Sequence, residues 1–198
     1  EVQILLGTQM IAKGHDIPNV TLVGIVNADI GLALPDFRSA ERTFQLLTQA
    51  AGRAGRGEVP GIVVIQTMAP DHYAVACAAQ QDYEAFYRKE IDFRKMMAYP
   101  PFAALANVVV RAKDEEQALA RSGELGRMLM PNPEGIRVLG PAPASVARVK
   151  NEFRYQMLIK AASRKRLGEI LGDIRQFAQA EKWSPTSLII DVDPMTIL

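Results

Sequence analysis

Residues 61–67, GIVVIQT, form a short run of mainly apolar and β-branched side chains. A continuous run of this kind is typical of a strand that is covered on both faces of a parallel sheet. Residues 21–26, TLVGIV, and residues 4–6, ILL, have the same character, while residues 39–49 show apolar side chains at helical spacing. Because strands and helices alternate, the first third of the chain is predicted to be α/β, with a ligand site at the carboxyl ends of its strands.

Two predicted helices and a pair of prolines follow this region. Residues 71–80 and 82–97 have the spacing of helices. Pro100 and Pro101 end the second helix, because consecutive prolines lack the amide donors that a helix requires. We therefore divide the chain into residues 1–70, a helical connector over residues 71–102 that ends in YPPF, and a C-terminal α+β domain over residues 103–198.

Strand and helix patterns in the last part of the chain follow the order βαββαβ. The expected strands are 106–111, 137–139, 155–161 and 187–192, the expected helices are 114–130 and 163–180, and a further short strand is expected near 146–149. This order is typical of a split-βαβ, ferredoxin-like sandwich. The fold class predicted for the whole chain is thus α/β, with a parallel sheet followed by a small α+β sandwich.

The composition excludes several classes of protein. No apolar run reaches the roughly 18 residues of a membrane span, so we expect no membrane partner. Among 198 residues the only cysteine is Cys77, which excludes an internal disulfide framework and favours a reducing, cytoplasmic environment. His15 and His72 have no partner at metal-ligand spacing, so no metal site is predicted. The opening residues EVQ lack a methionine or signal sequence, as expected for a piece of a longer protein.

The net charge of +1 hides a local concentration of basic residues. Residues 1–100 carry nine basic and eleven acidic side chains, whereas residues 101–198 carry fourteen and eleven. Positions 148 to 166 contain seven basic residues and one acid, Glu152; the basic residues are Arg148, Lys150, Arg154, Lys160, Arg164, Lys165 and Arg166. With Phe153 and Tyr155 interleaved, the segment is either a positive surface whose aromatic ring stacks on unpaired bases or a solvated sheet face.

A polar loop in the first third of the chain carries candidate binding residues. GTQMIAKGHDIP, residues 7–18, directly follows the first predicted strand. Its Thr8 and Lys13 suit a phosphate, Gly14 permits an unusual backbone angle, and Asp16 can accept from a ribose hydroxyl. The alternative is an ordinary loop in which Gly14 forms a turn and Asp16 acts as a cap.

A second motif, TQAAGRAGR at residues 48–56, combines glycines with arginines. Gly52 and Gly55 would each cost about 1 kcal/mol relative to alanine inside a helix, so they suit a close approach of the backbone to another group. Arg53 and Arg56 each follow a glycine, and a guanidinium binds phosphate well because it donates two parallel hydrogen bonds. The alternative is a solvated helix end with glycine caps.

These stretches together resemble a known family. The loop at residues 8–18 resembles motif V of superfamily 2 helicases, and QAAGRAGR resembles motif VI. With DFRSAERTFQLLTQAAGRAGR, YPPF and the closing DVDP, the whole chain resembles the primosomal protein N′ family of bacterial replication-restart helicases. The resemblance implies the C-terminal part of a RecA-like second motor lobe, then the ferredoxin-like domain, in a cytoplasmic protein that unwinds DNA with ATP.

The resemblance also implies roles for single residues. Arg56 resembles the arginine finger that reaches the γ-phosphate of ATP, and Arg53 lies beside it in the sequence. The matching nucleotide contacts are Gln49, Gly14 and Asp16, and the matching contacts to the nucleic-acid backbone are Thr8 and Lys13.

For the C-terminal domain, the resemblance implies two kinds of partner. One is branched and single-stranded DNA, for which the candidate contacts are Arg148, Lys150, Arg154 and Tyr155. The other is protein: the acidic tail of the single-strand-binding protein, with Arg164 as the candidate anchor, and other primosome proteins.

The sequence departs from that of a complete motor. It contains no G-x-x-x-x-G-K-[ST], so ATP and Mg²⁺ are expected to bind mainly to the other motor lobe of a longer protein. VVVRAKDEEQ imitates an acidic magnesium motif, but Asp114 is better explained as a helix cap. Zn²⁺ is expected only in the longer protein, and this chain alone is expected to be inactive as an ATPase. The alternatives are a non-catalytic adaptor and a different superfamily 2 repair helicase.

Overall fold

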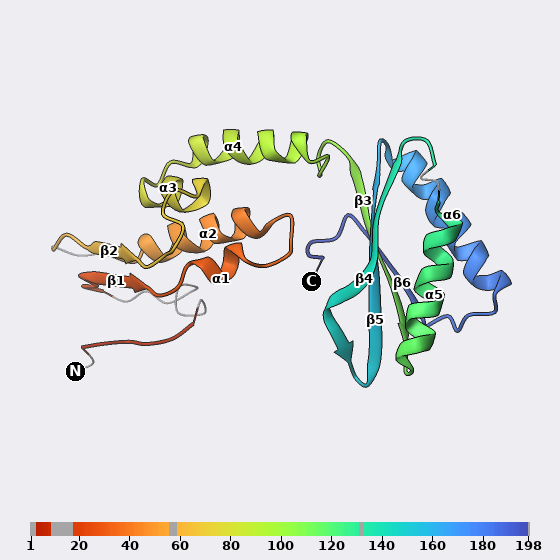
Figure 1. The fold of residues 1–198 in the computed structure, drawn as a ribbon. Coiled ribbons are helices and arrows are strands. Elements are labelled where there is room, and N and C mark those ends of the chain that lie inside the picture. Colours follow the sequence, from red (N-terminus) through yellow and green to blue (C-terminus); the bar gives the residue numbers. More distant parts are fainter. Residues whose placement is uncertain (1–2, 9–17, 56–58, 131–132, 198) are drawn as a thin grey trace. The chain divides into compact units, whose positions relative to one another are not determined.

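The computed structural model describes residues 3–8, 18–55, 59–130 and 133–197. The chain forms two compact units, Glu1–Asp92 and Phe93–Leu198, which we call the N-terminal and C-terminal units and describe separately (Figure 1). The domain bounds at residues 70 and 102 stay predictions.

A two-stranded parallel sheet and short helices make up the N-terminal unit. The strands are β1 (Leu22–Ile25) and β2 (Ile62–Ile65), which pair in parallel from Leu22↔Ile62 to Ile25↔Ile65. The helices are α1 (Asp29–Leu32), α2 (Ser39–Ala51), α3 (Tyr73–Ala79) and the beginning of α4 (Tyr83–Met96). Because α1 and α2 lie in the connection between parallel strands, the predicted α/β class is confirmed for this part of the chain.

The core of the N-terminal unit lies on one face of this sheet. Ile25 and Ile65 pack against a cluster in which Phe44 of α2 stacks on Phe86 of α4, with ring centroids 4.1 Å apart. Cys77 is buried in the same cluster, as expected for a packing residue. Side chains on the other face of the sheet, such as Ile62, are more than half exposed.

The strand predicted at residues 4–6 is wrong. Residues 3–8 have no regular structure, and Ile4, Leu5 and Leu6 are between 58% and 88% exposed. The apolar pattern of this stretch is the same as that of β2, but a strand also requires a neighbour to share its hydrogen bonds. Within the residues that the structure describes, the parallel sheet contains β1 and β2 alone.

The C-terminal unit has the predicted βαββαβ order. Its elements are β3 (Ala104–Ala112), α5 (Glu115–Met128), β4 (Ile136–Val149), β5 (Glu152–Ala161), α6 (Arg164–Ala180) and β6 (Leu188–Val192). The strands form an antiparallel sheet in the order β4-β5-β3-β6, and α5 and α6 cover one face of it (Figure 1). The α+β sandwich is thereby confirmed.

Strand β4 differs from its prediction. The stretches expected as two short strands, at 137–139 and 146–149, belong to one long strand that pairs with β5. Its register shifts between Leu139 and Ala142 and again between Pro143 and Arg148. Glycine and proline interrupt the apolar pattern at these shifts, so the sequence pattern breaks where the strand continues.

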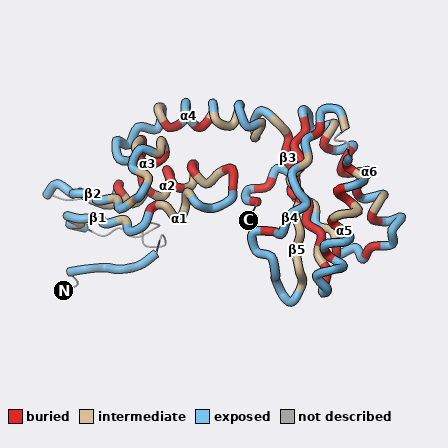
Figure 2. The backbone as a smooth tube through the Cα atoms, viewed as in Figure 1, coloured by how far each residue is buried: buried red, intermediate tan, exposed pale blue. Residues whose placement is uncertain are grey.

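Strand β3 is buried along almost its whole length and forms the centre of the C-terminal core (Figure 2). Ala106, Val108 and Val110 are fully buried against residues of α5 and α6. Trp183 also belongs to this core and meets Phe177 edge to face, with ring centroids 5.8 Å apart. Over the described ranges, no helix is long and apolar enough to cross a membrane.

Side-chain caps set where α5 and α6 begin. Asp114 Oδ1 accepts a hydrogen bond from the backbone N–H of Gln117 at 2.9 Å, so the interpretation of Asp114 as a cap is confirmed. Ser163 Oγ accepts from the backbone N–H of Arg166 at 3.1 Å. Both residues satisfy amide donors that the first turn of a helix otherwise leaves unpaired.

Candidate nucleotide and nucleic-acid interfaces

Gln49, a predicted nucleotide contact, and Arg53, predicted as a catalytic residue beside Arg56, lie at the C-terminal end of α2. Gln49 is exposed in the last turn of the helix, and Arg53 is half-buried in the turn that follows. The amide of Gly52 donates to the Thr48 carbonyl, and that of Arg53 to the Ala50 carbonyl, each at 3.0 Å. Gln49 and Arg53 therefore lie about one helical turn apart at the same end of α2.

The glycines of this motif allow a close approach within the chain itself. Gly55 has a φ of +75°, which favours glycine, and its amide donates to the Val20 carbonyl at 3.0 Å. A Cβ on Gly61 would lie 2.2 Å from the Gly55 nitrogen. The turn after α2 and the start of β2 thus approach each other closely at Gly55, and the approach of another group that Gly52 and Gly55 predict stays a prediction.

Four other predicted residues of the motor motifs lie outside the described residues; they are Lys13, Gly14, Asp16 and Arg56. Thr8 is described and is exposed in the irregular segment of residues 3–8. The structure therefore places Gln49 and Arg53 near each other and leaves the remaining nucleotide and backbone contacts as predictions.

A network of charged residues fixes the other end of α2. The buried Asp36 carboxylate accepts from the backbone N–H of Arg38 at 2.9 Å and pairs with Arg42 Nη1 at 3.0 Å. Arg38 Nε in turn lies 2.8 Å from Glu41 Oε2. The alternation of charge in DFRSAER is a usable signal for these residues, although no role was predicted for them. The network therefore anchors the first turn of α2.

Asp29 joins the carboxyl ends of β1 and β2. Its carboxylate accepts from Thr67 Oγ1 at 2.6 Å and from the Met68 amide at 2.8 Å. The hydrogen bond from Thr67 lowers the pKa of Asp29. The signal for Asp29 in the sequence, to which no role was assigned there, is an acid a few residues after an apolar strand. These contacts show Asp29 holding together the edge where α/β folds place ligands.

The predicted DNA-binding residues of the C-terminal unit lie on the hairpin formed by β4 and β5 (Figure 1). Lys150 and Asn151 form its turn with φ angles of 48° and 67°, as two-residue hairpin turns of type I′ require. The Cζ atom of Arg148 lies 4.9 Å from the ring centroid of Phe153, and its Nη2 donates to Asn151 Oδ1 at 2.6 Å. Arg148 and Lys150 are both exposed.

The two faces of the hairpin carry different predicted residues. Tyr155 pairs with Val110 and lies on the face that the helices cover, whereas Arg154 pairs with Arg111 and lies on the opposite face. Arg148 pairs with Phe153 and therefore shares the face of Tyr155. The structure brings the four predicted residues to one hairpin, but not to one of its faces.

Arg164 begins α6 at the mouth of a hollow of 220 Å³. The hollow is lined by Pro100, Pro101, Phe102, Ala103, Ala104, Ala162, Ser163, Arg164 and Asp193. The Arg164 side chain is 83% exposed, and its Nη2 lies 2.8 Å from Asp193 Oδ2. Since a guanidinium has five N–H donors, this ion pair leaves donors for a second carboxylate.

Lys160 differs from the rest of the basic segment because it is only 4% exposed. Its Nζ donates to the Met97 carbonyl at 2.9 Å and lies 3.4 Å from the ring centroid of Tyr99. Burial, and to a smaller extent the positive charge of Arg137, lowers the pKa of Lys160 to about 8. Lys160 thus attaches the start of the YPPF segment to the sheet, a role that the sequence did not reveal.

The histidine and acidic side chains do not gather into a metal site anywhere in the described ranges. His72 is the N-cap of α3, where its Nδ1 accepts from the Ala74 amide at 3.2 Å. Burial lowers the pKa of His72, which favours the neutral ring that this cap requires.

Two family models match the chain. Residues 95–195 match the primosomal protein N C-terminal domain, and residues 1–58 match the helicase conserved C-terminal domain. The first match covers β3 to β6, and the second covers the two motor motifs together with β1 and α2.

Several curated relatives are similar over nearly the whole chain. The chain is 43% identical over 200 residues to the replication restart protein PriA of Bacillus subtilis, covering 100% of the chain and 25% of the relative. It is 42% identical over 201 residues to the protein of that name from Treponema pallidum, covering 100% and 30%. Against the Haemophilus influenzae protein, the identity is 40% over 196 residues, covering 98% and 27%. The chain therefore spans about a quarter to three tenths of the length of these relatives.

Proposed function

Because the chain belongs to the family of the primosomal protein N C-terminal domain, we propose that it is the C-terminal part of a bacterial replication-restart DNA helicase. In this proposal the N-terminal unit supplies one side of an ATPase cleft, and the C-terminal unit binds DNA and protein partners. The longer protein acts in the cytoplasm, where it hydrolyses ATP, unwinds DNA at stalled forks and assembles the primosome.

The proposal rests on the arrangement of two residues at the C-terminal end of α2. Gln49 and Arg53 lie one turn apart there, within the region that matches the helicase model. A guanidinium at the edge of an α/β unit suits a phosphate bound by a second lobe, because it adds positive charge where negative charge develops. We assign Mg²⁺ and most ATP contacts to the rest of the longer protein, since this sequence lacks the phosphate-binding G-x-x-x-x-G-K-[ST]. Zn²⁺ is likewise assigned to the longer protein.

The decisive experiment uses the intact protein. Arg56→Ala should lower DNA-stimulated kcat by at least about a hundredfold, the order expected for an arginine finger, while ATP binding changes little. Arg53→Ala, at the neighbouring arginine of the same motif, is measured in the same assay for comparison. The chain of residues 1–198 alone should hydrolyse no ATP above background. Near-normal turnover of Arg56→Ala would favour the alternative, a non-catalytic adaptor.

For DNA binding we assign the β4–β5 hairpin. Arg148 and Lys150 are exposed near its turn, and Arg154 lies on its other face. A two-stranded ribbon with cations on both faces and at its tip suits a groove or a fork, because phosphates then surround it on more than one side. The rings of Phe153 and Tyr155 are both half-buried on one face and are the candidates for stacking on an unpaired base.

For protein binding we assign the hollow at Arg164. Its walls are mainly proline, alanine and phenylalanine, and Arg164 lies at its mouth. A short acidic peptide that ends in an apolar residue and a free carboxylate fits this chemistry: the carboxylate binds the guanidinium, and the apolar side chain contacts the proline and phenylalanine of the lining. The acidic tail of the single-strand-binding protein is the partner that we propose.

A further inference from the structure

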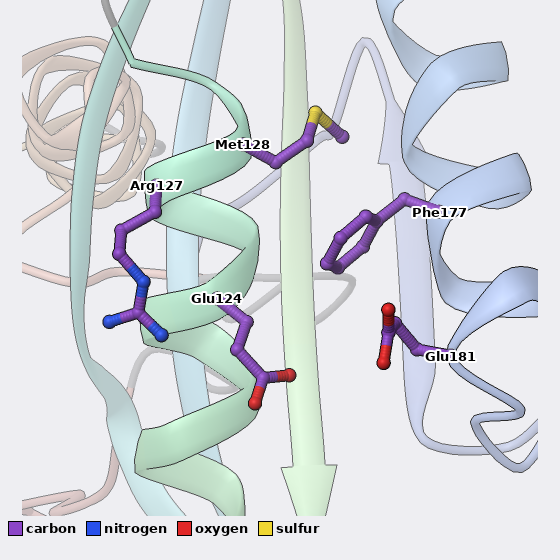
Figure 3. Close-up of a pocket in the computed structure, with 5 residues that line it drawn as sticks. All are labelled: Glu124, Arg127, Met128, Phe177 and Glu181. Carbon is purple, nitrogen blue, oxygen red and sulfur yellow. The ribbon is translucent and has the colours of Figure 1, made fainter.

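A groove of 480 Å³ lies between α5 and α6 in the C-terminal unit (Figure 3). It is lined by Glu124, Arg127, Met128, Phe177 and Glu181. Met128 and Phe177 are partly buried against the core, so they provide an apolar floor that solvent still reaches. Neither the basic hairpin nor the hollow at Arg164 includes any of these residues.

The two walls of the groove present the same pair of chemical groups at the same spacing. On α5, Glu124 precedes Met128 by four residues, and on the other wall Phe177 precedes Glu181 by four. Four residues of helix rise about 6 Å along the axis. Figure 3 shows the two carboxyl groups at one end of the groove, the Met128 thioether at the other and the Phe177 ring between them. The groove therefore has an acidic end and an apolar end, separated by about one helical turn.

Two carboxylates and one guanidinium line the groove, so the charge of its lining is net negative. Among the described residues, the carboxylates of Glu124 and Glu181 have no hydrogen-bond or ion-pair partner. The guanidinium of Arg127 lies back along α5, with Nη1 3.7 Å from where a Cβ on Gly123 would be. Glu181 is also the C-cap of α6, where unpaired carbonyl groups add partial negative charge.

We propose that this groove binds a helical segment of a partner protein that carries an apolar side chain and a lysine or arginine four positions apart. On such a helix the two side chains are also about 6 Å apart along the axis, so one placement satisfies both ends of the groove. The charge of the acidic end selects a basic residue over an acidic one. The partner chemistry is thus opposite to that of the carboxylate-binding hollow at Arg164.

The test uses the full chain and a synthetic helical peptide of about 16 residues, long enough to hold a helix. One face of the peptide carries leucine and, four positions later, lysine. With methionine methyl groups labelled by ¹³C, adding the peptide should shift the Met128 resonance in proportion to bound peptide. Peptides with serine in place of leucine, or glutamate in place of lysine, should shift it much less.

Two pairs of substitutions distinguish binding of the peptide at this groove from general attraction between opposite charges. Glu124→Gln with Glu181→Gln should weaken peptide binding about fivefold, since exposed ion pairs are individually weak. Glu115→Gln with Glu116→Gln removes the same charge from the exposed first turn of α5 and should leave binding unchanged. An unmoved Met128 resonance, or equal weakening by the two pairs of substitutions, would overturn the proposal.

Discussion

Replacing Lys160 with methionine removes a buried amine that has no carboxylate partner in the described part of the chain. The ammonium is compensated by the Met97 carbonyl at 2.9 Å and by the Tyr99 ring at 3.4 Å, while Arg137 repels it. Methionine has a similar length and no charge, so Lys160→Met keeps most of the packing and removes the titration. We therefore expect the substitution to change how stability depends on pH.

The direction of this pH dependence follows from the protonation states of Lys160 in the folded and the unfolded chain. Burial lowers the pKa of Lys160 from 10.5 to about 8, so between these values the unfolded chain binds a proton that the folded chain has lost. Stability from this group is therefore present above pH 10.5 and is lost as the pH falls through 8. The limiting slope is about 1.4 kcal/mol per pH unit. Screening by solvent reduces it, so we expect a total rise of about 1 kcal/mol between roughly pH 8 and 10.5.

Trp183 provides the measurement, because it is the only tryptophan of the chain and is buried in the unit that contains Lys160. Urea unfolding followed by its fluorescence gives the stability of the wild type and of Lys160→Met at each pH. The difference between them should be constant below about pH 7 and should then rise with pH in favour of the wild type. Lys165→Met, at an exposed position, is the matched control. A constant difference over the whole range, or the same rise against Lys165→Met, would refute the reasoning.

Three further predictions concern the C-terminal unit. Replacing Arg148, Lys150 or Arg154 with alanine should reduce the salt dependence of binding to single-stranded or forked DNA, by about 0.7 to 0.9 in the slope of log K against log salt concentration per lost phosphate contact. Fluorescence anisotropy measures the slope, with Arg127→Ala as control. Unchanged slopes would indicate a solvated sheet face. Arg164→Ala should weaken binding of an acidic peptide with a free carboxylate about tenfold in calorimetry. Amidating the carboxylate of the peptide should weaken its binding to the wild-type chain by a similar factor. Gly140→Ala should destabilise the chain by at least about 1 kcal/mol, because the φ of Gly140 is +105° and a Cβ would lie 2.7 Å from the Gln156 carbonyl oxygen. Gly168→Ala is the control: a Cβ at Gly168 meets no neighbouring atom within 4 Å, so this substitution should stabilise α6.

The order of elements in the C-terminal unit was predictable because each element carries its own local signals. Asp114 and Ser163 mark where α5 and α6 begin, and both act as caps in the structure. Strand β4 was predictable only in pieces, because it is continuous through pairing with β5 across Pro143. The same limit explains residues 4–6: their apolar pattern is local, but the pairing that makes a strand is not.

The candidate sites show the same difference between local features, which the sequence reveals, and contacts between distant segments, which it does not. Charge is a local property, and the sequence located the basic segment and the residues that a hairpin now brings together. Exposure and pairing depend on distant segments. Lys160 is buried by residues about 60 positions earlier, Arg164 meets Asp193 of the C-terminal segment, and Arg154 lies opposite Arg111 of β3. One run of similar side chains therefore contains a structural cation, a candidate carboxylate anchor and candidate phosphate contacts. The acidic groove shows the complementary case: Glu124 and Glu181 are ordinary helix-surface residues in the sequence, and only the packing of α5 beside α6 places both at one end of an apolar floor.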